Sequence, residues 1–316
     1  MKIVNLFTSV AGLIFIFGCQ DSGQSNIPVT EDQPKEELIV FGIYTADKAS
    51  AVVDEFAPVV EWLESDLSSR MGRPVKVQMK VANDYLLGIS DLTLGKAHLS
   101  RLGPASFIHA IEENPELDLL AMESKDGQRS FKGVIAIHKD SSFETLADLK
   151  STSFAFGDAL STIGRYLSQN ELLNAGIDGS ALSRYEFLGR HDRVGMAVAA
   201  GDFEAGALKD STFKKLVEAG QPIKKLVDFD NVTKPWVAHP DLRPELREAI
   251  RASMLEISPE NAEKIGIDGF LPAEISHYAS VKSAMAKADL LIPKPIEINS
   301  LKKFLENARQ NIVNAA

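Results

Sequence analysis

Short apolar runs and amphipathic stretches alternate along the chain from Leu38 onward, and this alternation predicts strands followed by helices. The run "ELIVFGIY" (37–44) is typical of a buried strand, whereas "DEFAPVVEWLESDLSSRMG" (54–72) carries apolar residues at helical spacing. Asn83 is expected to cap a helix, because Asn is a favoured N-cap residue. This first series is completed by strands over 74–81, 97–103 and 117–122 and by helices over 83–94 and 104–111.

A second series of strands and helices begins at residue 131. The segment "KPWVAHP", which contains Trp236, is predicted to be a loop because prolines bound it, and residues 242–313 are expected to be mostly helical. The strands of the second series are predicted over 131–139, 152–157, 184–189, 203–208 and 223–229, and its helices over 144–150, 161–175, 191–200 and 212–220.

The two series predict an α/β protein with two lobes, each a mixed β-sheet flanked by helices. We expect lobe 1 to comprise residues 37–130 plus 223–316, and lobe 2 to comprise residues 131–222. In open α/β sheets, ligands bind outside the carboxyl ends of the strands. A small ligand is therefore expected in the cleft between the lobes.

The first residues are typical of a targeting segment. An almost wholly apolar stretch follows Lys2 and leads to "IFGC" (16–19), and it is short for a membrane span. Residues 1–18 are therefore predicted to be a signal peptide, with an N-terminal anchor helix as the alternative. "IFGC" resembles the lipobox of bacterial lipoproteins, which implies that Cys19 carries a lipid. Residues 19–36 are polar and contain Pro and Gly, so we expect a flexible tether.

Composition and charge narrow the function. The net charge of −10 over 316 residues argues against nucleic-acid binding, which needs a basic face, but it does not exclude a small anion. The single cysteine, Cys19, excludes a disulfide within the chain and a cysteine-based metal cluster. The nucleophile-elbow and zinc-protease motifs are absent from the sequence. We therefore expect neither an enzyme nor a bound cofactor or metal.

The stretch "FGDALSTIG" (156–164) carries the chemistry. The predicted strand ends at Gly157, a turn follows at Asp158, and Ser161 and Thr162 open a helix. Helix N-termini attract anions through unpaired N–H groups and partial positive charge, and the two hydroxyls add donors at the same place. Plain N-capping requires only one of them. From these residues alone, an anion cradle and a capped turn remain equally good interpretations.

Several segments in order resemble the substrate-binding proteins of phosphate, phosphite and phosphonate ABC transporters. The resemblance spans residues 38–280 and implies a type II periplasmic-binding-protein fold, whose two lobes close over the ligand. It rests on "FAFGDALSTIG" (154–164), "GKAHLSRLGPASFI" (95–108), "GVIAIHKDSSFETLADLK" (133–150) and "FLGRHDRVGMAVAAGDFEAGALKD" (187–210).

The resemblance implies roles for individual residues. Ser161 and Thr162 stand at the family's anion-binding hydroxyls, and His191 stands at a histidine that donates to the ligand. Asp210 is expected to line the pocket and to select protonated phosphorus oxyanions over sulfate, with helix capping as the alternative. Tyr44 stands where many members place an aromatic residue in the cleft.

Three further residues complete the predicted site. Ile163 stands where the family usually has a third hydroxyl, so a less hydrated oxyanion or an organic substituent packed on Ile163 becomes possible. Asp158, in the turn before the hydroxyls, is expected beside the ligand. Arg101 lies at the end of a predicted strand and is expected either to face the cleft or to form a salt bridge.

Together these features predict a monomeric, lipid-anchored protein on the periplasmic side of the envelope, or on the cell surface of a Gram-positive host. It would bind a phosphorus oxyanion and deliver it to the transmembrane subunits of an ABC importer, with Cys19 as the membrane anchor. The alternative is a sensory oxyanion-binding protein of the same fold that signals to a membrane histidine kinase.

Overall fold

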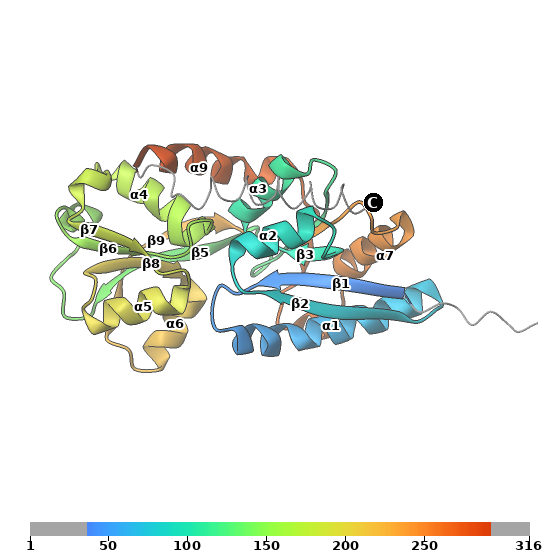
Figure 1. Ribbon diagram of the computed structural model, residues 1–316. Helices are drawn as coiled ribbons and strands as arrows, with labels where there is room; N and C mark the ends of the chain where they lie inside the picture. Colours follow the sequence, from blue (N-terminus) through green and yellow to red (C-terminus); the bar gives the residue numbers. More distant parts are fainter. Residues whose placement is uncertain (1–36, 292–316) are drawn as a thin grey trace, which may run out of the picture. The chain divides into compact units, whose positions relative to one another are not determined.

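The computed structural model describes residues 37–291. The predicted signal peptide (1–18), the predicted tether with Cys19 (19–36) and the end of the chain (292–316) lie outside the described residues. The described part of the chain forms two β-sheets with helices packed against them (Figure 1). This arrangement confirms the predicted mixed α/β architecture.

The first sheet has six strands in the order β11-β4-β10-β3-β1-β2. Strand β1 runs parallel to β2 and β3, while β10 runs antiparallel to β3 and β4. Its strands are β1 (Glu37–Tyr44), β2 (Val75–Ala82), β3 (Leu99–Arg101), β4 (Asp118–Glu123), β10 (Pro235–Ala238) and β11 (Phe270–Leu271). The helices of this lobe are α1 (Ala49–Met71), α2 (Tyr85–Thr93), α3 (Pro104–Glu113), α7 (Pro244–Leu255), α8 (Pro259–Lys264) and η4 (Ile275–Tyr278).

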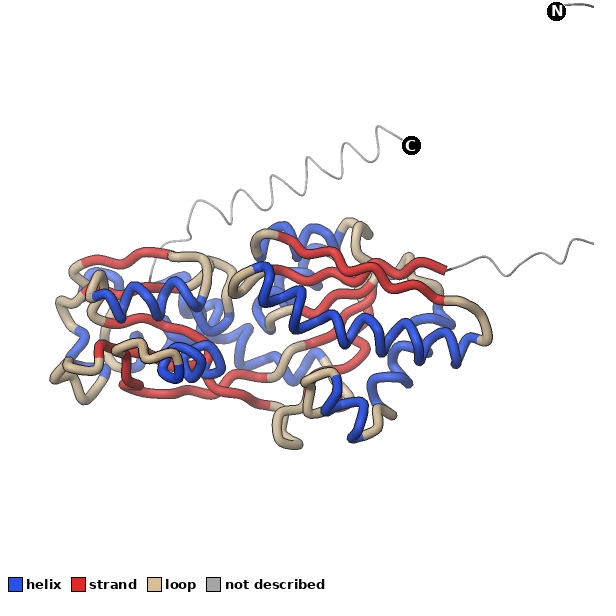
Figure 2. The backbone as a smooth tube through the Cα atoms, turned by 90° about the horizontal axis from the view of Figure 1, so that it is seen from below, coloured by secondary structure: helices blue, strands red, loops and turns tan. Residues whose placement is uncertain are grey.

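The second sheet has five strands in the order β7-β6-β8-β5-β9. In Figure 2 the strands, drawn in red, form two groups with helices beside each. The second group comprises β5 (Ser130–His138), β6 (Ser153–Phe156), β7 (Arg184–Phe187), β8 (Ala205–Lys209) and β9 (Ile223–Val232). Its helical segments are η1 (Leu146–Leu149), η2 (Thr162–Leu167), α4 (Ser168–Asn174), η3 (Gly179–Ala181), α5 (His191–Ala200) and α6 (Asp210–Glu218).

The place where the chain returns to the first lobe differs from the expectation. We expected residues from 223 onward in lobe 1, but β9 pairs with β5 from Ile223↔His138 to Val232↔Ser130 and so belongs to the second sheet. The return therefore occurs between β9 and β10. Strand pairing is a tertiary interaction, and the apolar content of β9 alone does not identify its partner.

The core of the first lobe is built around α1 and the central strands. Val59, Leu63 and Leu67 of α1 are buried on one face of the helix, as its periodicity predicted. Trp236, predicted in a loop, lies instead in β10, where it is fully buried and stacks on Phe41 of β1 with ring centroids 5.0 Å apart. The flanking prolines concealed this strand; Pro235 is its first residue, a position that tolerates proline.

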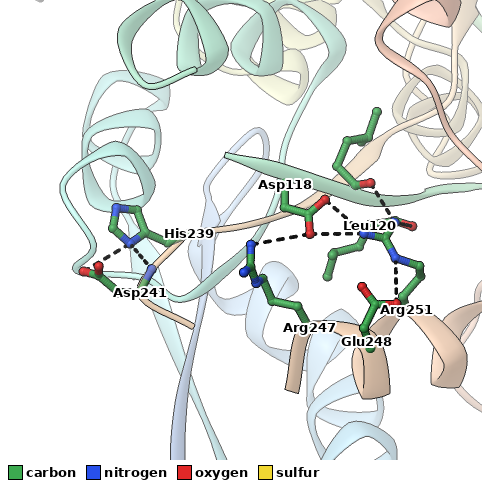
Figure 3. Close-up of polar contacts among 8 residues, drawn as sticks. Asp118, Leu120, His239, Asp241, Arg247, Glu248 and Arg251 are labelled. Atoms are coloured by element: carbon green, nitrogen blue, oxygen red, sulfur yellow. Dashed lines mark hydrogen bonds and ion pairs between the residues drawn. The ribbon is translucent and has the colours of Figure 1, made fainter. Parts of the chain in front are cut away.

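Two polar contacts of the first lobe fix the start of α2 and the position of α7. The N-cap of α2 is Asp84 rather than Asn83, and its carboxylate accepts a hydrogen bond from the Leu87 amide (2.7 Å). Helix α7 is held to β4 by Arg251, which donates to the Leu120 carbonyl (2.9 Å) and to the Asp118 carboxylate (3.0 Å; Figure 3). These contacts fix the side of the sheet that lies away from α2 and α3.

Helix α9 (Ala279–Leu291) connects the two lobes through its packing. It contacts α3 in the first lobe and both η2 and α4 in the second, and it lies along these helices in Figure 1. Across residues 37–291, no helix is both long enough and apolar enough to cross a bilayer.

Candidate functional site

A small cavity of about 60 Å³, which we call the inner cavity, lies between the two lobes. It is lined from the first lobe by the end of β1 and the starts of α2 and α3, and from the second lobe by the starts of η2 and α5 and the end of β8. The carboxyl ends of parallel strands therefore meet here, as the fold class predicts. Its polar lining includes Tyr44, Tyr85, Ser161, Thr162, His191 and Asn231.

The segment before Ser161 turns sharply because two glycines meet. The Gly157 amide donates to the Gly164 carbonyl (2.7 Å), and a Cβ on Gly164 would lie 2.8 Å from the Cα of Gly157. No side chain fits at that distance. Segment η2 then begins as a π-helix, in which the Tyr166 amide donates to the Ser161 carbonyl (3.2 Å). This geometry brings the first residues of η2 to the wall of the inner cavity.

Both predicted hydroxyls lie at this wall and keep a proton to donate. Ser161 Oγ accepts from the Gly164 amide (3.0 Å), and Thr162 Oγ1 accepts from the Ala105 amide of α3 (2.9 Å). A hydroxyl that accepts from an N–H group still has its own O–H to give. The backbone amides of Thr162 and Ile163, at the start of η2, take no acceptor from residues 37–291. The segment therefore presents donors suited to an anion.

Two tyrosines close the first-lobe side of the inner cavity. Tyr44 Oη accepts from the Gly103 amide (2.5 Å) and shares a hydrogen bond with Ser106 Oγ (3.0 Å). Burial raises the pKa of Tyr44 to about 12, so its phenol stays neutral and can donate. Tyr85 Oη lies 3.5 Å from Ser161 Oγ, and burial raises its pKa as well. The two rings pack with centroids 4.2 Å apart.

His191 opens α5 and contributes a buried, neutral imidazole. Its backbone amide donates to the Ala46 carbonyl of the first lobe (3.1 Å), and the residue is only 4% exposed. Burial, with the charge of Lys209, lowers the pKa of His191 to about 3. Its Nδ1 finds no hydrogen-bond partner among the described residues, and neither does Oδ1 of Asn231. Buried polar atoms without partners are rare, and here they mark a place for a ligand.

Three cations also line the inner cavity, and two of them have partners. Lys209 forms an ion pair with Asp47 (2.6 Å), and Arg101 forms a buried two-pronged pair with Glu123, one prong of which measures 2.9 Å. Lys234 has no carboxylate within ion-pair distance in the described part of the chain. Within residues 37–291 no three His, Cys, Asp or Glu side chains gather as metal ligands.

The structure brings most of the predicted site residues together. Two of them lie elsewhere. Asp158 does not line the inner cavity; it accepts from the Leu160 amide (2.7 Å) and shapes the turn. Asp210 begins α6, pairs with Lys214 (2.7 Å), and lines the larger space beside the inner cavity rather than the inner cavity itself. The predicted residues at the inner cavity are Tyr44, Arg101, Ser161, Thr162, Ile163 and His191.

Sequence reasoning found Arg101 but missed other charged residues of the site. Lys209, immediately before Asp210, lines the inner cavity, whereas Asp210, the first residue of α6, lines only the larger space beside it. Asp47 follows the carboxyl end of β1, so the strand-end rule could have found it. Lys234 follows β9, whose place in the second sheet was not predicted, and it left no local signal.

The neutral state of His191 predicts an acid-sensitive fold. Because the pKa of His191 falls from about 6.5 in the unfolded chain to about 3 in the folded protein, the unfolded state binds one more proton between these values. Stability should be unaffected by His191 above pH 6.5 and should fall by up to about 1.4 kcal/mol per pH unit below it. The measurement is the free energy of urea unfolding as a function of pH.

His191→Gln is the matched control, because other acidic groups also reduce stability at low pH. We expect the variant to lose stability less steeply than the native chain between pH 6 and pH 4.5, by about one proton. An NMR titration in which the His191 ring protonates near pH 6.5 in the folded protein would contradict the expectation.

With this geometry described, the chain can be compared with known proteins. Residues 41–278 match the family model for the ABC transporter, phosphonate, periplasmic substrate-binding protein. The chain belongs to this family. It is therefore a periplasmic substrate-binding component of an ABC transporter and not an enzyme.

Individual relatives agree with the family. The chain is 22% identical over 260 residues to the probable ABC transporter phosphite binding protein PhnD1 of Prochlorococcus marinus, covering 74% of this chain and 87% of that protein. It is 24% identical over 219 residues to the phosphate-import protein PhnD of Mycolicibacterium smegmatis, covering 66% of each.

Solved structures show the same fold. PhnD1 of Prochlorococcus marinus, solved in complex with methylphosphonate, superposes with a TM-score of 0.71 at 21% identity, covering 79% of this chain and 98% of that one. A binding-protein component of a phosphonate ABC transporter from Pseudomonas aeruginosa gives a TM-score of 0.69 at 17% identity, covering 88% and 99%. The predicted type II periplasmic-binding-protein fold is confirmed.

Proposed function

We propose that the protein binds a phosphorus oxyanion (phosphate, phosphite or phosphonate) in the inner cavity and delivers it to the permease of an ABC importer. The observation that carries this proposal is the convergence of Ser161 and Thr162 on one wall of the cavity. Each hydroxyl already accepts from a backbone amide, so each has its proton to offer. Donors fixed in this way favour an anion over a neutral solute.

The remaining inner-cavity residues fit the same ligand class. Tyr44 and Tyr85 are neutral hydroxyls, His191 is a neutral imidazole, and Lys209 adds positive charge. A cavity of about 60 Å³ suits a compact head group such as a tetrahedral anion. The relatives support the class rather than one member, because one is named for phosphite, one for phosphate, and one structure contains methylphosphonate.

We expected Asp210 to select protonated oxyanions over sulfate, but a different carboxylate is better placed for this role. Two carboxylates of the first lobe line the inner cavity, Asp47 and Glu55, and Asp47 is the one that contacts the second lobe, through Lys209 and Thr212. It already accepts from Lys209 (2.6 Å) and Thr212 (3.2 Å), and a P–OH group could donate to its remaining lone pairs. Sulfate carries no such proton near neutral pH, so we propose that Asp47 disfavours it.

A panel of oxyanions tests the proposal. Thermal unfolding and isothermal titration calorimetry are run on residues 37–316 with phosphate, phosphite, methylphosphonate and sulfate. A true ligand stabilises the folded state in proportion to its concentration over Kd, so at least one phosphorus oxyanion should raise Tm clearly. We expect the affinity for sulfate to be at least about 10-fold lower than the affinity for the best phosphorus oxyanion. No response to any phosphorus oxyanion contradicts the proposed ligand class; equal affinity for sulfate contradicts the role of Asp47.

We further propose that the protein acts as a monomer held to the membrane by a lipid on Cys19, which lies outside the described residues. The support is the apolar stretch that ends in "IFGC" and the polar segment that follows it. A Cys19→Ala protein should be released from the membrane fraction. Continued partition of that variant with membranes contradicts lipid anchoring.

A further inference from the structure

A second, larger space adjoins the inner cavity. This outer cavity, of about 490 Å³, is lined by α1 and the 265–268 loop of the first lobe, by β5 and the start of α6 of the second, and by the segments that connect the lobes. The two cavities share six lining residues and are therefore neighbours across one wall. The shared residues are Glu55, Phe56, Arg101, Phe131, Lys209 and Lys234.

The two volumes suit different parts of one ligand. The inner cavity, at about 60 Å³, has room for a compact head group, whereas 490 Å³ lies within the range of sites for small organic molecules. The residues that line both cavities therefore mark the path that a substituent would follow from a head group at Ser161 and Thr162 into the outer cavity. The rings of Phe56 and Phe131 provide apolar surface along that path.

The charges around the outer cavity identify which substituent it can hold. Its acidic residues mostly have lysine partners already: Asp210 pairs with Lys214 (2.7 Å), and Asp268 pairs with Lys125 (2.7 Å). Glu55 is exposed, and its charge is already opposed by Arg101 and Lys234. These carboxylates would therefore gain little from a positively charged substituent on the ligand.

Lys234, in contrast, would be stabilised by a negatively charged substituent. It lines both cavities, its ammonium lies 5.8 Å from the centre of the Phe131 ring, and no carboxylate among the described residues pairs with it. Desolvation, together with the charges of Arg101 and Lys209, lowers the pKa of Lys234 to about 7, against the opposing charges of Glu123 and Glu55. A half-buried cation without an ion-pair partner is costly, and an anion brought by the ligand would reduce that cost.

We propose that the ligand is an organophosphonate whose substituent ends in a carboxylate, which lies in the outer cavity and binds Lys234. This inference rests on the proposed function, because the phosphonate group must first occupy the inner cavity. The amides and hydroxyls at the start of η2 bind the phosphonate, and Lys234 binds the carboxylate of the substituent. The protein then discriminates among organophosphonates by the charge at the far end of the substituent.

Three phosphonates of matched length test the inference: 3-phosphonopropionate, propylphosphonate and 3-aminopropylphosphonate. Calorimetry at pH 7 should show 3-phosphonopropionate binding about 10-fold or more tighter than propylphosphonate, as expected for one charge-assisted contact. Lys234→Met should abolish this difference and leave the affinity for propylphosphonate within about threefold. Lys214→Met, at the outer cavity but already paired with Asp210, is the matched control and should change neither affinity.

A second readout does not depend on the variant. Because the pKa of Lys234 in the unliganded protein is about 7, its amine is about half protonated at pH 7. The carboxylate should raise that pKa, so the native protein should take up as much as about half a proton on binding 3-phosphonopropionate. Calorimetry in buffers of different ionisation enthalpy measures that uptake. Propylphosphonate corrects for protons exchanged by the phosphonate group itself.

Three results would overturn the inference. The first is tightest binding of the amine ligand, and the second is equal weakening of all three ligands by Lys234→Met, which would assign Lys234 to the head group. The third is equal proton uptake with 3-phosphonopropionate and propylphosphonate. If no phosphorus oxyanion binds at all, it is the proposed function that fails.

Discussion

Removing both hydroxyls at the start of η2, in the double variant S161A/T162A, is expected to lower the affinity for the phosphorus oxyanion by about 10²- to 10⁴-fold. Each hydrogen bond to a charged group contributes about 1.5–3 kcal/mol, which corresponds to roughly 10- to 100-fold per hydroxyl. The amides of Thr162 and Ile163 remain, so residual binding should persist. Calorimetric titration with the best ligand of the oxyanion panel measures the loss.

The matched control keeps the hydroxyl and removes only a methyl group. Thr162→Ser should bind within about threefold of the native protein, because its oxygen can still accept from the Ala105 amide. Ser161 is also the N-cap of η2, so the double variant should lose about 1 kcal/mol of stability, and binding is compared well below its Tm. Native-like affinity in S161A/T162A would show that the hydroxyls do not contact the ligand.

Glu123→Ala is expected to have the largest effect on stability, about 3–5 kcal/mol. The substitution leaves the guanidinium of Arg101, whose side chain is 13% exposed, without its carboxylate partner. It also removes the acceptor for Nε1 of buried Trp236 (3.2 Å). Although burial raises the pKa of Glu123, Arg101 lowers it overall, so the carboxylate is charged in the folded protein. Urea unfolding of the unliganded protein measures the loss.

A double variant separates the loss of the ion pair from the cost of leaving Arg101 unpaired. If the cost arises from an unpaired Arg101, then the double variant R101M/E123M should be more stable than Glu123→Ala, because replacing both charges with apolar groups removes the unpaired one. Glu123→Gln should lie between the two, since its amide oxygen can still accept from Trp236. A loss below about 1 kcal/mol in Glu123→Ala would contradict this account.

Ile163 changes meaning once the structure is known. From the sequence we expected that an organic substituent could pack on it, at a position where the family resemblance implied a hydroxyl. Ile163 is 3% exposed and packs in the core of the second lobe with Phe154 and Phe229. Ile163 still lines the inner cavity, and its backbone amide remains a donor there. We therefore place the proposed substituent toward Lys234, which lines the outer cavity, and not on Ile163, which does not line it.

The sequence by itself determined the features that depend on local order. Periodicity located α1, and the boundaries of α3 and α5 follow from Pro104 and from "GRHD" before the next apolar stretch. The hydroxyl pair of "FGDALSTIG" and the ordered segments around it identified the family, the two-lobed fold and six of the residues at the inner cavity. These signals are short-range, so a single chain displays them.

Only the tertiary structure decided how charge is arranged around the cavity. Asp47 and Lys209 come from different lobes and meet as an ion pair, and Asp210 pairs with Lys214 at the outer cavity. Lys234 became a cavity residue because β9 joined the second sheet. An electrostatic partner is determined by distance in space, not by separation along the chain, so no local pattern reports which charges are paired and which one is left for a ligand.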